Sequence, residues 1–95
     1  MGPKVLTSFC GFDVVVMPPS PQDEIFRDYP SRTIYWSAYR NAGCRTLVFT
    51  RLGLENPRLA DLQVRALLSE ERVEPDSAMV QQLLSQVRGY YQGLP

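Results

Sequence analysis

Histidine is absent from the 95 residues of the chain. Histidine is the commonest general acid–base group near neutral pH and a common zinc ligand, so its absence weakens most hypotheses of catalysis or zinc binding. Serine and cysteine nucleophiles would lack their usual base, and there is no glycine-rich phosphate-binding loop. We therefore expect no catalytic residues, no metal site and no cofactor. A small enzyme would need carboxylate or tyrosine chemistry, or a site shared between subunits.

Lysine and cysteine are also scarce. Lys4 is the sole lysine, so nine of the ten basic residues are arginine. Cys10 and Cys44 are the only cysteines, and two thiols without histidine make a poor metal site. Both cysteines fall within predicted strands, where we expect them to be reduced and buried. A disulfide stays an alternative if the two strands are neighbours.

An excess of charge of either sign is missing too, because ten basic and ten acidic residues cancel. This balance argues against a protein whose main task is to bind nucleic acid or an anionic membrane. No apolar run approaches the length of a membrane span, and residues 1–8 lack the pattern of a secretory signal. We expect one domain over residues 1–95, located in the cytoplasm and without a membrane partner.

The C-terminal part of the chain predicts two amphipathic helices that fold against each other. Asn56 followed by Pro57 is a strong helix start and predicts a helix over about 57–72. Asp76 caps a second helix over about 76–91. The apolar residues of that helix recur at spacings of three, four and seven, which places them on one face: Val80, Leu83, Leu84, Val87, Tyr90 and Tyr91.

The N-terminal part predicts strands within residues 5–17. Two apolar runs flank Gly11, and the run from Val14 to Val16 is apolar on both faces, which favours a central position in a sheet. Gly11 is either a bulge or the corner between two strands, and the strand order depends on which.

The middle of the chain contains a proline-rich stretch and then the clearest strand signal. Residues 21–29 fit either a short helix or an extended loop. Residues 32–52 predict a hairpin, with Asn41 and Gly43 in the turn between its strands. The fold class is therefore α+β, a small antiparallel sheet of about four strands packed on a C-terminal two-helix hairpin, in the order β-β-(α)-β-β-α-α.

The leading functional hypothesis is a small, non-catalytic protein–protein interaction module that acts as a regulatory, adaptor or accessory subunit. Catalytic groups are lacking, while the short chain has more aromatic, amphipathic and arginine-bearing surface than it can bury. The expected partner is another protein or a second copy of the chain. We expect the binding residues on the predicted hairpin, the first helix and the end of the second: Tyr35, Tyr39, Arg40, Arg45, Arg58, Arg65, Arg72, Tyr90 and Tyr91.

Three of these arginines, Arg58, Arg65 and Arg72, recur every seven residues and would form a stripe of forked donors. Asp61 is spaced to pair with both Arg58 and Arg65, and runs of surface charge are ordinary on helices, so a self-paired, solvated helix face is the favoured interpretation of this spacing. Tyr90 and Tyr91 either complete the core or sit at an exposed end, because the preceding Gly89 weakens the helix.

The second functional hypothesis is a nucleic-acid-binding regulator that uses the same tyrosines and arginines. Bases of a single strand stack on such aromatics while arginines hold the phosphates. Residues 45–51 lack the glycine–aromatic alternation of an RNA-recognition strand, and the net charge of zero gives this hypothesis the lower rank.

Overall fold

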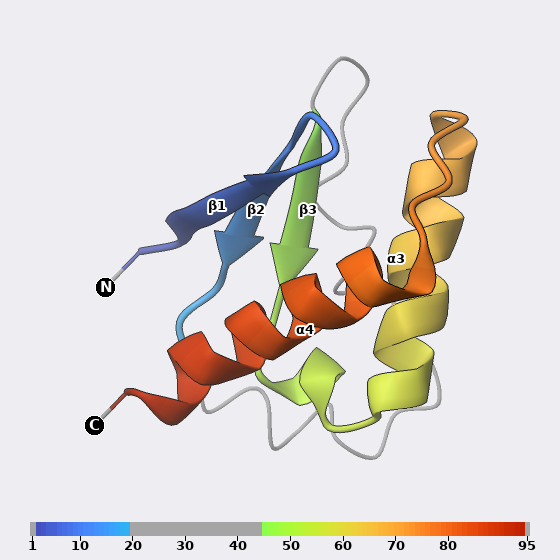
Figure 1. The fold of residues 1–95 in the computed structure, drawn as a ribbon. Coiled ribbons are helices and arrows are strands. Elements are labelled where there is room, and N and C mark those ends of the chain that lie inside the picture. The colour runs from blue at the N-terminus through green and yellow to red at the C-terminus, as the bar shows by residue number, and fades with distance from the viewer. Residues whose placement is uncertain (1, 20–44, 95) are drawn as a thin grey trace.

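The computed structural model describes residues 2–19 and 45–94 of the chain (Figure 1). In chain order the elements are β1 (Lys4–Phe9), β2 (Phe12–Val16), β3 (Thr46–Phe49), the 3-10 turn η1 (Leu52–Leu54), α3 (Pro57–Glu70) and α4 (Ser77–Gln92). The fold is α+β, a three-stranded mixed sheet followed by two helices, so the predicted class is confirmed. The predicted helix over 21–29, the predicted strand over 32–39 and Cys44 lie outside the described residues.

A two-residue turn joins β1 to β2. Cys10 and Gly11 have φ angles of 52° and 82°, and Phe9 pairs with Phe12 across the turn. Positive φ at both turn residues matches the right-handed twist of antiparallel strands. Gly11 is therefore the corner between two strands, and the only irregularity in their pairing lies between Val5 and Thr7. Cys10 is a half-buried turn residue with a free thiol, so its predicted place inside a strand is wrong.

The central strand of the sheet is β2, as the apolar run from Val14 to Val16 predicts. It pairs antiparallel with β1 but parallel with β3, where Val14 lies opposite Leu47 and Val16 opposite Phe49. The prediction of an antiparallel sheet is therefore wrong for this pair. The chain between Val16 and Thr46 is long enough for the crossover that parallel neighbours require, and apolar alternation alone carries no information on strand direction.

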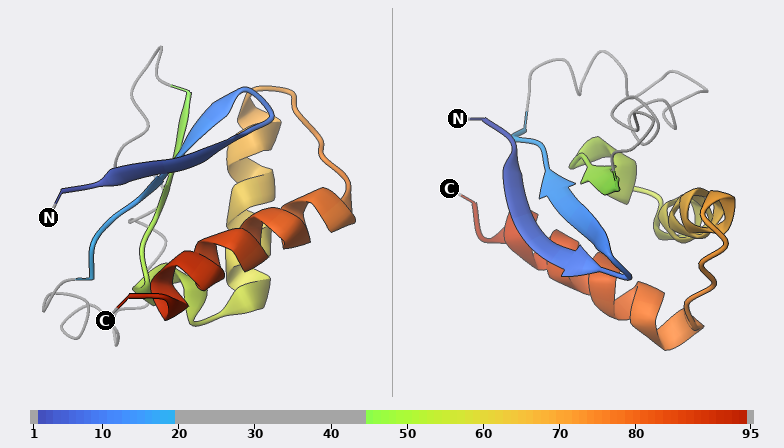
Figure 2. Two further views of the ribbon diagram at one scale, coloured as in Figure 1. Left: turned by 60° about the vertical axis from the view of Figure 1, so that its left-hand side comes forward. Right: turned by 90° about the horizontal axis from the view of Figure 1, so that it is seen from above.

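The core lies between one face of the sheet and the helices. Phe12, Val14 and Val16 of β2 alternate toward this core and are almost fully buried. Figure 2 shows α4 lying across that face, with α3 beside it. On α4 the predicted apolar face is confirmed: Val80, Leu83, Leu84, Val87 and Tyr91 are buried and Tyr90 is half-buried against them. Each buried valine or leucine contributes about 1.5–3 kcal/mol before conformational entropy is subtracted.

The helix starts are capped as predicted. The Asn56 side chain accepts a hydrogen bond from the backbone N–H of Leu59, and the Asp76 side chain accepts one from Met79. These bonds satisfy donors that the first turn of a helix leaves free. The starts of α3 and α4 are therefore set by local sequence.

The end of α3 is unusual because Arg72 occupies a left-handed conformation with φ of 60°. The Arg72 N–H donates to the Ser69 carbonyl at 2.9 Å, and the Val73 N–H donates to the Leu68 carbonyl at 3.0 Å. This is the Schellman arrangement, in which glycine normally holds the left-handed position. The helix ends two residues before the predicted boundary because Arg72 turns the chain toward α4.

We predict that Arg72→Gly stabilises the protein. Glycine avoids the steric cost that a β-carbon meets at positive φ, so the free energy of unfolding should rise by about 0.5–1 kcal/mol. Urea denaturation measures the change. Arg72→Ala is the control, because it removes the charge and keeps the β-carbon, and it should give no such gain. An equal gain in both variants would assign the effect to the charge and contradict the backbone explanation.

Candidate functional site

The predicted site residues within the described ranges do not converge on one place. Tyr35, Tyr39 and Arg40 lie outside the described residues. The others fall at three locations: Arg45 beside the β1–β2 turn; Arg58, Arg65 and Arg72 on α3 or just after it; and Tyr90 and Tyr91 on α4. The described candidates therefore occupy three separate surroundings.

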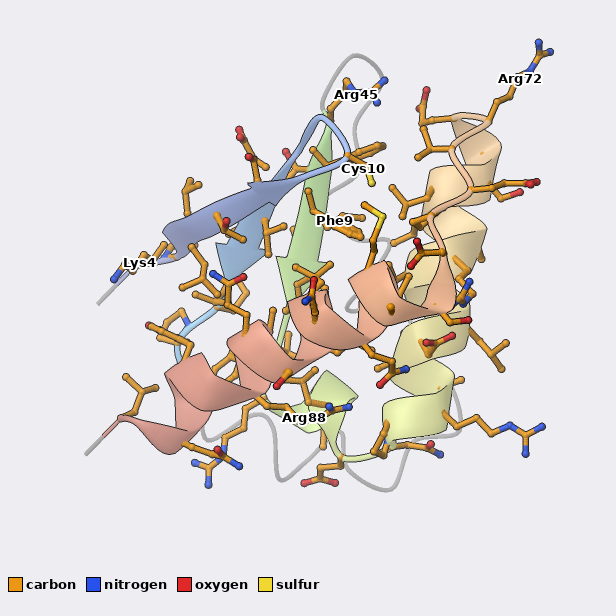
Figure 3. All side chains as sticks on the ribbon, in the orientation of Figure 1. Lys4, Phe9, Cys10, Arg45, Arg72 and Arg88 are labelled. Carbon is orange, nitrogen blue, oxygen red and sulfur yellow. The ribbon has the colours of Figure 1, made fainter. Side chains whose placement is uncertain are left out.

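Arg45 is held against the β1–β2 turn, where Figure 3 labels it. Its guanidinium carbon lies 4.4 Å from the centre of the Phe12 ring, a cation–π contact. Its Nε donates to the Gly11 carbonyl at 3.3 Å, and a terminal nitrogen lies 4.0 Å from a carboxylate oxygen of Glu71. Arg45 thus stabilises the turn and connects it to the end of α3, while about half of its side chain stays exposed.

Arg65 joins the two helices. Its Nε donates to Asp61 Oδ1 at 2.6 Å, and other guanidinium nitrogens reach the Ser77 hydroxyl at 3.3 Å and the Pro75 carbonyl at 3.4 Å. The second oxygen of Asp61 accepts a bond from the Gln81 side chain at 2.7 Å. The hydrogen bond from Arg65 lowers the pKa of Asp61 most, while partial burial opposes that shift. Arg65 therefore has a structural role between α3 and α4.

The three-arginine stripe is not continuous. Among the described residues Asp61 pairs with Arg65 and not with Arg58. Arg58 is exposed near the start of α3, whereas Arg72 lies beyond the end of the helix and extends away from the protein (Figure 3). The seven-residue spacing thus places an exposed arginine at each end of α3 and a bonded one between them.

Tyr91 belongs to the core and Tyr90 to its margin. The Tyr91 hydroxyl lies 2.6 Å from the Met17 carbonyl and 3.1 Å from the Phe49 carbonyl. Because Met17 also donates its N–H to Phe49, this hydroxyl closes the end of the β2–β3 pair. The Tyr90 ring is half-buried, stands edge-on to Tyr91 at 5.2 Å between centres, and has the Lys4 ammonium 5.7 Å from its centre.

A feature that the sequence prediction missed is the outward side of α4. Only one of the 16 residues of α4 is charged, namely Arg88. The exposed residues of the helix, here called the neutral face, are Ser77, Ala78, Met79, Gln81, Gln82, Ser85, Gln86, Gly89 and Gln92. Solvated helices usually carry charges on their outer side, whereas the centres of protein interfaces are depleted of charge. A count of charge for each predicted helix would have revealed this face.

The neutral face borders a groove between β1 and α4. The groove has a volume of about 240 Å³ and is lined from Ser8 to Cys10 on the β1 side and by Met79, Gln82, Leu83 and Gln86 on α4. Met79 is 43% exposed. An exposed apolar group therefore accompanies the lack of charge on this side of the molecule.

Comparison with known proteins found no relative. No protein-family model matches the chain, and neither the curated proteins nor the solved structures yielded a match. Within residues 2–19 and 45–94, no three acidic or cysteine side chains gather closely enough to hold a metal ion. No helix in these ranges is long and apolar enough to cross a membrane.

We predict that Tyr91→Phe destabilises the protein by about 1–2 kcal/mol, because the buried strand carbonyls lose the hydroxyl donor while the ring stays in place. Tyr90→Phe is the matched control on the adjacent residue, and it should change the free energy of unfolding by less than about 0.5 kcal/mol. Thermal and urea unfolding measure both variants. Equal effects of the two substitutions would contradict the assignment of Tyr91 to the core.

We predict that Asp61→Asn weakens the protein at neutral pH by about 1 kcal/mol and costs little at low pH. The folded-state pKa of Asp61 is lowered, so the contribution of its charge is present above the unfolded value of about 4. That contribution is lost as the pH falls through the folded-state pKa. Urea denaturation from pH 7 to pH 3 should show the free energies of unfolding of the parent protein and of Asp61→Asn converging. The control is Glu74→Gln on the exposed connection between α3 and α4, which should have little effect on the free energy of unfolding. A pH-independent loss in Asp61→Asn would contradict the assignment.

Proposed function

We propose that the chain is a small non-catalytic protein–protein interaction module of the cytoplasm, acting as a regulatory, adaptor or accessory subunit through its neutral face. The observation that supports this proposal most is the lack of charged side chains on the outward side of α4. The partner is another protein or a second copy of the chain.

The neutral face can be covered at low electrostatic cost. Docking removes water from the surface, and burying an unpaired charge is far more costly than burying an amide or a hydroxyl that finds a new hydrogen bond. Glutamine side chains such as Gln82 and Gln86 both donate and accept, so a partner of varied polarity can satisfy them. Met79 adds a flexible apolar group that adapts to a partner surface.

The contrast with α3 supports the same conclusion. Four of the 14 residues of α3 are charged: Arg58, Asp61, Arg65 and Glu70. The two helices follow each other in one chain, so the neutrality of α4 is a property of that helix and not of the overall composition. Tyr90 lies at the end of the neutral face nearest Lys4, which extends the surface with an aromatic side chain of the kind that interfaces favour.

The decisive experiment places an ion pair on the neutral face. Gln82→Glu with Gln86→Lys keeps the net charge and forms a helix-supporting pair four residues apart, so folding should be unaffected. A partner would then have to bury two charges, and we expect association to weaken at least about tenfold. Gel filtration with light scattering and affinity capture from the source cell, with and without nuclease, measure the association.

The matched control is Leu62→Glu with Ala66→Lys, which creates the same pair at exposed positions of α3 and should leave association unchanged. A strictly monomeric protein that captures nothing would contradict the proposal, as would equal association of the two double variants. Loss of all captured material on nuclease treatment would favour the nucleic-acid hypothesis instead.

A further inference from the structure

A second concave site lies between η1 and the C-terminal part of α4, away from the groove beside β1. It has a volume of about 330 Å³, and its lining contains two arginines and one carboxylate: Arg51, Leu54, Glu55, Arg88, Tyr91 and Gln92. We call it the arginine pocket. Its size is at the lower end of the range for small-molecule sites.

Arg88 is the unusual member of the lining. Its Nη2 amino group is buried and has no hydrogen-bond partner among the residues that the structure describes. Figure 3 shows the Arg88 side chain on the side of α4 that faces η1. A buried cationic donor without an acceptor is unfavourable, and native proteins seldom leave one. Arg65 differs, because its guanidinium donates hydrogen bonds to Asp61, Pro75 and Ser77. The fold therefore supplies acceptors to an arginine that has a structural role.

Arg51 brings a second guanidinium to the same pocket. It is exposed and makes no ion pair with any residue in the described ranges. Glu55 also lines the pocket, but Nη2 of Arg88 still has no partner. The described part of the lining therefore has two positive charges and one negative charge, an excess that matches a ligand with a single negative charge.

We propose that the arginine pocket binds a small molecule with one carboxylate group. Guanidinium groups bind planar carboxylates through paired charge-assisted hydrogen bonds, and such a ligand gives Arg88 Nη2 the acceptor it lacks. Gln92 contributes a neutral donor, while Leu54 and the Tyr91 ring contact a short apolar part of the ligand. The Tyr91 hydroxyl donates to the sheet carbonyls and takes no part.

A doubly charged phosphate fits this pocket less well. Its second negative charge would lie near the Glu55 carboxylate. The described lining holds no third cation to balance that charge. Among the described lining residues the pocket shares only Gln92 with the neutral face, because its charged members are Arg51 and Glu55, which flank η1, and Arg88.

The test is a titration of the intact chain with sodium propionate at constant ionic strength, followed by NMR of backbone amides and of the arginine and glutamine side chains. We expect saturable shifts confined to residues 51–55, Arg88, Tyr91 and Gln92. Parallel titrations with sodium chloride should give no saturation, and inorganic phosphate should bind more weakly than propionate. Saturation by phosphate alone would contradict the proposal, and so would shifts with propionate that rise linearly and match those with chloride.

Three variants make the test specific. Arg88→Met removes the unpartnered amino group, so it should fold at least as well as the parent protein and bind propionate at least about tenfold more weakly. Arg51→Gln changes an exposed residue and should also weaken binding. Arg58→Gln is the control, because it removes an exposed arginine of α3 outside the pocket and should leave binding unchanged. Equal propionate affinity in all three variants would overturn the proposal, whether or not the neutral face binds a protein.

Discussion

Strand β2 and helix α4 contribute to one hydrophobic core, and the other described elements pack around them. β2 is hydrogen-bonded on both sides, and its alternate residues Phe12, Val14 and Val16 are covered by the core that α4 helps to form. The Tyr91 hydroxyl adds a polar tie at the end of the β2–β3 pair. A strand paired on both sides cannot move without breaking two ladders, so the position of α4 follows from that of the sheet.

The packing of α4 against the sheet divides the helix into an inward and an outward side with different chemistry. The inward residues are determined by packing, because changes of volume in a close-packed core are costly. The outward residues are free of that requirement, yet they include no charge. Arg88 lies between these two sides, half-buried and without a partner for one nitrogen. Both proposed sites therefore use α4, the neutral face along its outer side and the arginine pocket near its C-terminal end.

The sequence predicts well what local interactions determine. The caps at Asn56 and Asp76 and the apolar face of α4 depend on spacings within one helix, and all three are confirmed. The central place of β2 follows from its apolar residues on both faces. These features need no knowledge of distant parts of the chain.

Other features depend on contacts between distant residues or on conformations that residue type does not reveal. The parallel direction of β3 is a matter of topology, and the antiparallel prediction was wrong there. Arg72 and Cys10 adopt positive φ, although neither residue type favours it. The neutral face could have been found by counting charges. The arginine pocket could not, because Arg51 and Arg88 meet only in the folded chain.

Native-state hydrogen exchange measures whether β2 and α4 form one cooperative unit. If they do, the slowest amides of both elements exchange with the same free energy of opening, within about 1 kcal/mol, and this value equals the global free energy of unfolding. Exchange of the α4 amides at a free energy several kcal/mol below that of the β2 amides would show that the helix opens on its own and would contradict a shared unit.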